Sequence, residues 1–425
     1  ICVCAHLTQT RYAQKACAEI RGNMEFSEQL KIYAETHFEN RKKYFAPILS
    51  EIEAGLSLCS EEEALLMKFF YGTMPLRDAG EYPFEIFLSY VRHALWLRKT
   101  IDWCKKLPED LFVHDVLYYR INSEDISDCR SFFYEQLKDR IAGLDEYQAA
   151  VEINYWCVEH ATYEMADDRT AGPMTMYRSG KGRCGEESTF TVTALRSVGL
   201  AARQVYTPRW AHCDDNHAWV EVWVNGEWHF LGACEPEEKL DRGWFTGPAG
   251  QALLIHSRTF GDYAAGKREE VIGRDGAVVC HNVTASYTKT RKLRIQVRKQ
   301  DNTPAAHAQV SVEILNMAEY FPAAGLETDE QGGTSIRLGL GDIRLQARSE
   351  GKFVERYCNL AEDGVGAADA DCAVTLVLKD SEAGMKDALS GVSACEWHLA
   401  KLCAPKEVVV RESVLSEEEV SRQMQ

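Results

Sequence analysis

The chain has 425 residues, of which 45% are hydrophobic and 27% are charged, a composition typical of a folded globular protein with two or three domains. Its formal net charge of −17, from 65 acidic and 48 basic residues, excludes nucleic acid as an expected partner because phosphate binding requires basic surface. No apolar run reaches the roughly 18 residues that a membrane-spanning helix requires, so no membrane span is expected.

The chain contains fifteen cysteines, which are scattered and odd in number and form no Cys-x-x-Cys pair. A secreted disulfide scaffold would be shorter and evenly paired. We therefore expect thiols in a reducing compartment and predict a cytoplasmic location.

The first third of the chain is predicted to be helical. Hydrophobic residues follow the helical period over residues 10–163, with a capping box at Ser60–Glu63 and breaks at three prolines. The aromatic residues of this region are expected to be core, or alternatively the wall of a substrate cleft. They are Trp96, Trp103, Tyr118, Tyr119, Phe132, Phe133 and Tyr134.

A Gly-rich loop leads into a helix at Arg183-Cys184-Gly185-Glu186. The helix is predicted from about Glu186 to Val198, with Gly199 as its stop. Cys184 would then lie at the helix N-terminus, where unpaired N–H groups and the helix dipole favour a thiolate. The dipole alone contributes about 0.3–1 kcal/mol, less than one pKa unit. A nucleophile at Cys184 therefore needs a second group, normally a histidine.

His217 is that candidate, at the start of a predicted strand over residues 217–224 in which the side chains alternate. The strand ends at Asn225-Gly226, a strong hairpin signal. A two-residue loop would place Cys234 opposite His217, whereas a bulged three-residue loop would place Glu235 there. We predict the three-residue loop, with a Glu235 carboxylate oxygen bonded to His217, because a carboxylate stabilises an imidazolium better than a thiol does.

Four ordered motifs resemble the transglutaminase core that is shared with peptide:N-glycanases. They are Gly182-Arg183-Cys184-Gly185-Glu186, Arg196 to Arg203, His217 to Val222, and Trp228 followed by Cys234-Glu235-Pro236. The resemblance implies a papain-like fold and a triad of Cys, His and Asp. On this chain it implies Cys184 as nucleophile, His217 as base and Glu235 in the place of the Asp.

Further residues near these motifs are weaker candidates for a role. Asp214 and Asp215 are the alternative carboxylates for the third position of the triad. Arg183, Trp210 and Trp219 are candidates for contact with the substrate. The alternative for Arg183 is an ion pair with a local acid, and the alternative for Trp210 is packing within its loop.

Residues after about 278 predict strands instead of helices. Short alternating runs are separated by turn signals, which favours a small β-sandwich. The runs are 293–297, 310–314, 343–347 and 374–378. Residues 292–338 resemble the Ig-like modules related to carboxypeptidase regulatory domains, which implies a structural or adhesive role.

The predicted fold class is α+β, in four parts. These are an α-helical region over 1–144, a papain-like transglutaminase core over 145–265, an all-β Ig-like sandwich over 285–380, and a helical or loose tail over 381–425. A metal site is not expected, because the histidines and cysteines near residues 212–234 match no structural zinc spacing. No organic cofactor is expected either.

These features predict thiol-dependent acyl transfer at an amide through a Cys-His-Glu triad and an acyl-thioester intermediate. Water is the favoured acceptor, which would make the protein a peptidase or amidase acting on a peptide, protein or glycopeptide. The alternatives are a protein-glutamine transglutaminase, a glycanase-type deglycosylating enzyme, and a non-catalytic binding or scaffold protein that retains the fold.

Overall fold

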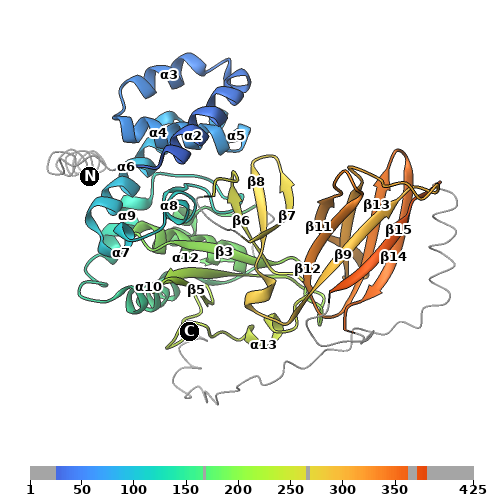
Figure 1. Cartoon of the computed structure of the whole chain (residues 1–425). Coiled ribbons are helices and arrows are strands. Elements are labelled where there is room, and N and C mark those ends of the chain that lie inside the picture. The colour runs from blue at the N-terminus through green and yellow to red at the C-terminus, as the bar shows by residue number, and fades with distance from the viewer. Residues whose placement is uncertain (1–24, 166–168, 265–268, 362–370, 381–425) are drawn as a thin grey trace. The chain divides into compact units, whose positions relative to one another are not determined.

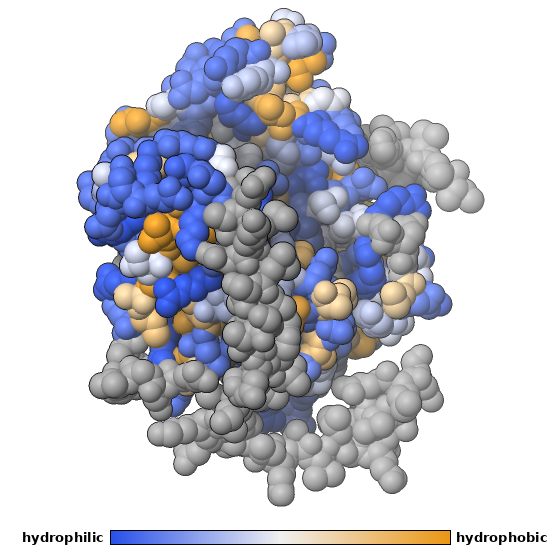
Figure 2. Space-filling model, turned by 90° about the vertical axis from the view of Figure 1, so that its right-hand side faces the viewer, coloured by the Kyte–Doolittle hydropathy of each residue, from blue (hydrophilic) through white to orange (hydrophobic). Residues whose placement is uncertain are grey.

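The computed structural model describes residues 25–165, 169–264, 269–361 and 371–380, which form a mixed helical and β structure (Figure 1). The tail predicted over 381–425 lies outside these residues. In the described ranges, no helix combines the length and the hydrophobicity that crossing a membrane requires. The face shown in Figure 2 is mainly hydrophilic, with small hydrophobic patches.

The first part of the described chain is helical, as predicted, and its caps explain where the helices begin. The Ser60 hydroxyl accepts the Glu63 N–H at 3.2 Å, and the Glu63 carboxylate accepts the Ser60 N–H at 2.9 Å. Prolines stand directly before α5, α6 and α8. The helices are α2 (Glu28–Arg41), α3 (Leu49–Ser57), α4 (Glu61–Thr73), α5 (Leu76–Glu81), α6 (Phe84–Thr100), α7 (Asp102–Lys105), α8 (Glu109–Phe112), α9 (Arg130–Leu137) and α10 (Glu146–His160). Short helical turns lie at Lys42–Phe45 (η1) and Val113–Leu117 (η2).

Aromatic side chains fill the core of this helical region. Helix α4 packs against both α2 and α6. Tyr118, Tyr119 and Phe133 are at most 2% exposed, and the first two rings stack with their centroids 5.1 Å apart. The expectation that they belong to the core is confirmed for these three residues, since buried aromatic rings supply much of the apolar area that stabilises a fold.

Helix α12 (Cys184–Ser197) is the central helix of the region that follows, and every residue from Glu186 to Ser197 is buried. A helix buried on all sides must satisfy its polar side chains internally. The hydroxyls of Ser188, Thr189, Thr193 and Ser197 each donate to the carbonyl oxygen four residues earlier. Gly199 follows with a φ of +84° and ends the helix, as predicted.

The same part of the chain also forms a six-stranded sheet, in which the strand order is β5-β4-β3-β6-β8-β7. Its strands are β3 (Ala202–Thr207), β4 (His217–Val224), β5 (Glu227–Leu231), β6 (His256–Phe260), β7 (Glu270–Asp275) and β8 (Val278–Asn282). Shorter elements are the parallel pair β1 (Thr162–Tyr163) and β2 (Lys181–Gly182), the helices α11 (Pro173–Ser179) and α13 (Thr246–Ala249), and the turn η3 (Thr284–Ser286). Strand β4 is buried along nearly its whole length, which explains its Val- and Trp-rich sequence.

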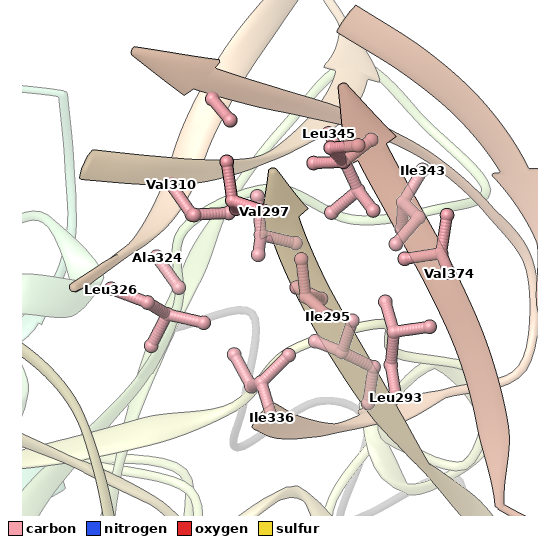
Figure 3. Close-up of a cluster of buried hydrophobic side chains, with 14 of the residues drawn as sticks. Leu293, Ile295, Val297, Val310, Ala324, Leu326, Ile336, Ile343, Leu345 and Val374 are labelled. Atoms are coloured by element: carbon pink, nitrogen blue, oxygen red, sulfur yellow. The ribbon is translucent and has the colours of Figure 1, made fainter. Parts of the chain in front are cut away.

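Residues beyond 289 form two sheets that share one hydrophobic core (Figure 3). One sheet has the order β11-β10-β13-β14-β16 and the other β12-β9-β15. The strands are β9 (Thr290–Arg298), β10 (Gln309–Asn316), β11 (Glu319–Glu327), β12 (Gly333–Gly339), β13 (Asp342–Ser349), β14 (Lys352–Asn359), β15 (Cys372–Val377) and β16 (Lys379–Asp380). The four predicted strands are therefore present, and the Ig-like classification stays a prediction.

The chain divides into two compact units that interleave along the sequence. The first contains residues 1–203, 220–229 and 260–267, and the second contains residues 204–219, 230–259 and 268–425. The division passes through β3, β4, β5 and β6. The domain boundaries predicted from the sequence stay predictions, because these units are defined by packing and not by chain order.

Candidate active site

Cys184 is the first residue of helix α12 and is half-buried. The preceding residue, Arg183, is extended with a φ of −83° and a ψ of 169°, so the helix begins at the cysteine, two residues before the predicted start. The carbonyl of Arg183 accepts the N–H groups of Glu186 and Glu187, both at 2.9 Å. These bonds fix the first turn of the helix, and Cys184 lies at its N-terminal end, the position that favours a thiolate.

Glu186 holds this helix start in place, a role that the sequence analysis did not assign. Its buried carboxylate accepts the N–H of Arg183 at 2.6 Å and the N–H of Ala171 at 2.9 Å. Such charge-assisted bonds to backbone N–H groups are stronger than neutral ones. Gly182 packs closely here, because a Cβ at this position would lie 2.3 Å from the Met176 sulfur and would require that side chain to move.

Arg183 faces local groups in this structure. Its guanidinium donates to the carbonyl oxygen of Arg169 at 3.1 Å and lies 3.5 Å from the Glu186 carboxylate. These contacts match the alternative of a local ion pair. Contact between Arg183 and a substrate stays a prediction.

His217 begins strand β4, and the residue is 6% exposed within a group of aromatic side chains. The ring centroids of four residues lie between 4.8 and 6.2 Å from that of His217: Trp244, Phe245, Trp219 and Trp210. Burial lowers the pKa of His217 to about 4, while the charge of Asp215 acts in the opposite direction. The imidazole is consequently neutral at pH 7, the form that can accept a proton.

Trp210 and Trp219 lie behind the histidine as part of the core. They are 2% and 0% exposed, and the Trp219 indole N–H donates to the Tyr287 hydroxyl at 2.9 Å. For Trp210, this burial supports packing within its loop, the alternative to substrate contact. Both rings contact His217. A role for either ring in substrate contact stays a prediction.

The predicted three-residue loop after β4 is wrong. Strand β5 begins at Glu227, so only Asn225 and Gly226 connect the two strands. Their φ values of +54° and +91° are those of a type I′ turn, which Asn-Gly favours without a bulge. Strand β5 then ends at Leu231, before the chain reaches Cys234 or Glu235. The pairing register consequently cannot decide which of these two residues faces His217.

Glu235 bonds to a residue that the sequence analysis missed. Its two carboxylate oxygens accept the indole N–H of Trp244 at 3.1 and 2.9 Å. In the described part of the chain, no hydrogen bond joins Glu235 to His217. Burial raises the pKa of Glu235 to about 7; the bond from Trp244 opposes this rise and the charge of Glu237 adds to it.

Trp244 connects the carboxylate to the histidine. The residue is 59% exposed, and its ring centroid lies 4.8 Å from that of His217. It is therefore the accessible member of the aromatic group around the histidine. Its sequence signal was the aromatic pair at 244–245, which comes after the last predicted motif, Cys234-Glu235-Pro236.

Asp215 and Asp214, the alternative acids, have different partners. Asp215 accepts the N–H of Asn216 at 2.8 Å and is the charged group that acts on His217. Asp214 accepts the N–H of Met317 at 2.8 Å. Among the described residues, no group of three or more His, Cys, Asp or Glu side chains is arranged to hold a metal ion.

Cys184 belongs to the first compact unit, whereas His217 and Glu235 belong to the second. The pairing of the thiol with the imidazole stays a prediction.

Residues 135–233 match the family model of the Transglutaminase-like superfamily, so the chain contains a transglutaminase-like domain. This range includes Cys184 and His217 and ends two residues before Glu235. No curated protein sequence matches the chain.

Several solved structures are similar to parts of the chain. A putative cysteine protease from Cytophaga hutchinsonii is 14% identical with a TM-score of 0.26, over 42% of this chain and 64% of that one. Red sea bream transglutaminase is 12% identical with a TM-score of 0.24, over 55% and 57%. A TGase is 17% identical with a TM-score of 0.21, over 27% and 34%. The chain thus spans less than two thirds of each of these proteins, and such low TM-scores extend the resemblance no further than the matched domain.

Proposed function

We propose that this protein carries out thiol-dependent acyl transfer at an amide, with Cys184 as nucleophile and His217 as general base. The observation that carries the proposal is the position of Cys184 as the first residue of buried helix α12, within a transglutaminase-like domain. A thiol at a helix N-terminus is favoured as thiolate, and the N–H groups of the first turn favour an oxyanion.

The reaction follows from these groups. His217 accepts the thiol proton, and the Cys184 sulfur forms a bond to the amide carbonyl carbon. The carbonyl electron pair moves onto oxygen, where backbone N–H groups at the helix start stabilise the negative charge. When the carbonyl re-forms, the C–N bond breaks and the imidazolium returns its proton to the leaving amine. Water or a second amine then attacks the thioester and releases Cys184.

Hydrolysis of a peptide or protein amide is the favoured outcome, because water needs no binding site of its own. Transfer to a lysine amine and release of a glycan from asparagine are the alternatives within the same chemistry. A binding or scaffold protein without activity is the alternative from another class. The presence of Cys184 and His217 in the matched domain argues against that alternative.

For the third position of the triad, we propose that Glu235 acts on His217 through Trp244 and not by a direct hydrogen bond. Glu235 acts as a positioning residue by holding the Trp244 indole against His217, as the bonds between Trp244 and Glu235 suggest. Asp215 supplies the negative charge that stabilises the imidazolium during the reaction.

The test is a comparison of Cys184→Ala with Cys213→Ala, because Cys213 is an exposed cysteine whose thiol pKa is raised by desolvation and nearby aspartates. Pure protein is incubated with peptide, glycopeptide and glutamine-donor libraries, and iodoacetamide labelling is measured at pH 6. We expect Cys184 to be labelled fastest and Cys184→Ala to abolish turnover, while Cys213→Ala leaves both unchanged. Turnover that survives Cys184→Ala would overturn the proposal.

A further inference from the structure

The hairpin of β10 and β11 has an unusual turn. Met317 and Ala318 connect the two strands with φ values of +52° and +58°. Such left-handed conformations favour Asn and Gly and are strained for a residue with an ordinary Cβ. Strain of this kind persists only where surrounding contacts stabilise it. The contacts of this turn are with the loop that precedes His217.

Asn316, the last residue of β10, makes the first of these contacts. Its side-chain amide donates to the carbonyl oxygens of Trp210 and Cys213 at 2.9 and 2.7 Å, and the residue is 4% exposed. Because both partners are acceptors, the side chain must donate two hydrogen bonds, and the amide NH₂ does so. The single side chain thereby joins two points of the 208–215 loop.

The neighbouring residues of the hairpin add two further contacts. The Met317 N–H donates to the Asp214 carboxylate at 2.8 Å. At the start of the loop, the Arg209 guanidinium lies 3.9 Å from the centroid of the Phe321 ring and 3.9 Å from the Glu319 carboxylate. The hairpin therefore holds the loop at both ends and in its middle.

The same loop determines the surroundings of His217. The Trp210 N–H donates to the Asp215 carbonyl at 2.9 Å, and the Asp215 N–H donates to the Cys213 carbonyl at 2.9 Å. Trp210 packs against the histidine ring, and Asp215 is the charge that acts on it. Asn316 thus binds the carbonyls of the two residues, Trp210 and Cys213, that are themselves bonded to Asp215.

We propose that the β10–β11 hairpin tip is a positioning element for the general base, and that Asn316 is a positioning residue for His217. The expected effect on catalysis rests on the proposed function. The expected effect on the position of the loop before His217 rests on the contacts described above. The β-rich region is then part of the catalytic apparatus, and its removal would leave the loop before His217 without three of its anchors.

The test replaces Asn316 with Ala, Gln and Asp in the full chain, with Leu315→Ala as the matched control. Leu315 is the preceding residue of the same strand, so its side chain lies on the opposite face, and it is 40% exposed. The titration of the His217 ring is followed by NMR, together with kcat, KM and thermal unfolding. The carboxylates around this ring are Asp215 on its own loop and Glu235, which reaches it through Trp244.

We expect Asn316→Ala to move the His217 titration midpoint toward that of a hydrated histidine and to lower kcat on the order of ten- to hundredfold, with KM nearly unchanged. Asn316→Asp should be worse, because it places acceptors against two carbonyls, and Asn316→Gln should restore part of the effect. Leu315→Ala should change neither quantity.

An unchanged His217 titration in folded Asn316→Ala would overturn the inference, as would an equal effect of Leu315→Ala. If Asn316→Ala does not fold, Asp214→Asn tests the same loop by weakening the bond from Met317, and an unchanged titration in that variant has the same meaning. The NMR titration needs no turnover, so a failure of the proposed function would be recognised separately by the absence of activity in the unmodified chain.

Discussion

The start of helix α12 and the start of strand β4 are stabilised in different ways. Around Cys184, the contacts come from residues within about fifteen positions of the cysteine, chiefly Arg183, Glu186 and Ala171. Around His217, the rings of Trp244 and Phe245 come from a later part of the chain, besides those of the nearby Trp210 and Trp219. The remote hairpin residue Asn316 bonds to the loop that carries Trp210. A nucleophile that depends on a helix start can be built locally, whereas a buried base needs side chains from many elements to exclude water.

The largest effect is expected from removing the base itself. His217→Gln should lower kcat/KM by about 10²–10⁴-fold, the usual contribution of a general base, with the fold intact. His212→Gln, on the exposed loop just before β4, is the matched control and should be nearly silent. Steady-state kinetics with the substrate found in the library screen provide the measurement. Equal activity of the two variants would remove His217 from the mechanism.

The second effect concerns the local half of the comparison. Glu186→Ala leaves the N–H groups of Arg183 and Ala171 without their acceptor, and should lower the free energy of unfolding by about 2–4 kcal/mol. Glu186→Gln keeps one acceptor oxygen and should cost less. Urea unfolding at pH 7 measures both values. A cost below about 0.5 kcal/mol for the alanine variant would show that α12 begins at Cys184 without this carboxylate.

The third effect concerns the surroundings of His217, where Glu235 and His217 make the free energy of unfolding depend on pH in opposite directions. The pKa of Glu235 rises from 4.5 to about 7 on folding. Its contribution to the free energy of unfolding is therefore fully present below pH 4.5 and is lost as the pH rises toward 7. The pKa of His217 falls from 6.5 to about 4, so its contribution is present above pH 6.5 and is lost as the pH falls toward 4. Each amounts to about 1–3 kcal/mol after solvent screening.

Unfolding curves between pH 4 and pH 8 separate the two groups. Glu235→Gln should remove the loss of stability between about pH 4.5 and 7, and His217→Gln should remove the loss between about pH 6.5 and 4. Trp244→Phe, which keeps an aromatic side chain and deletes the N–H donor, should raise the Glu235 pKa further. Curves that coincide with that of the unmodified chain would contradict this account of the burial of both groups.

The smallest effect is expected at the two hairpin turns. Gly226→Ala should destabilise the protein by about 1 kcal/mol, because it adds a Cβ where φ is positive. Ala318→Gly should stabilise it by about 0.5–1 kcal/mol by relieving the same strain. Thermal unfolding of both variants is the measurement. Destabilisation by Ala318→Gly would mean that the β10–β11 turn is not strained.

Local chemistry made much of this protein predictable. The capping box at Ser60, the stop at Gly199 and the alternation in β9, β10, β13 and β15 were recognisable because each depends on residues a few positions apart. The match of residues 135–233 to the transglutaminase-like superfamily likewise confirms a resemblance carried by short ordered motifs.

The surroundings of the histidine were decided by the tertiary structure. The prediction that counted residues from Asn225-Gly226 to Glu235 assumed that β5 continued, but a turn ends the strand at Leu231. Trp244 and Asn316 reach the histidine and its loop by folding and not by spacing in the chain. A sequence determines the helix start that carries Cys184, because caps and glycines act over a few residues. It does not determine what surrounds His217, because burial there depends on how distant elements pack together.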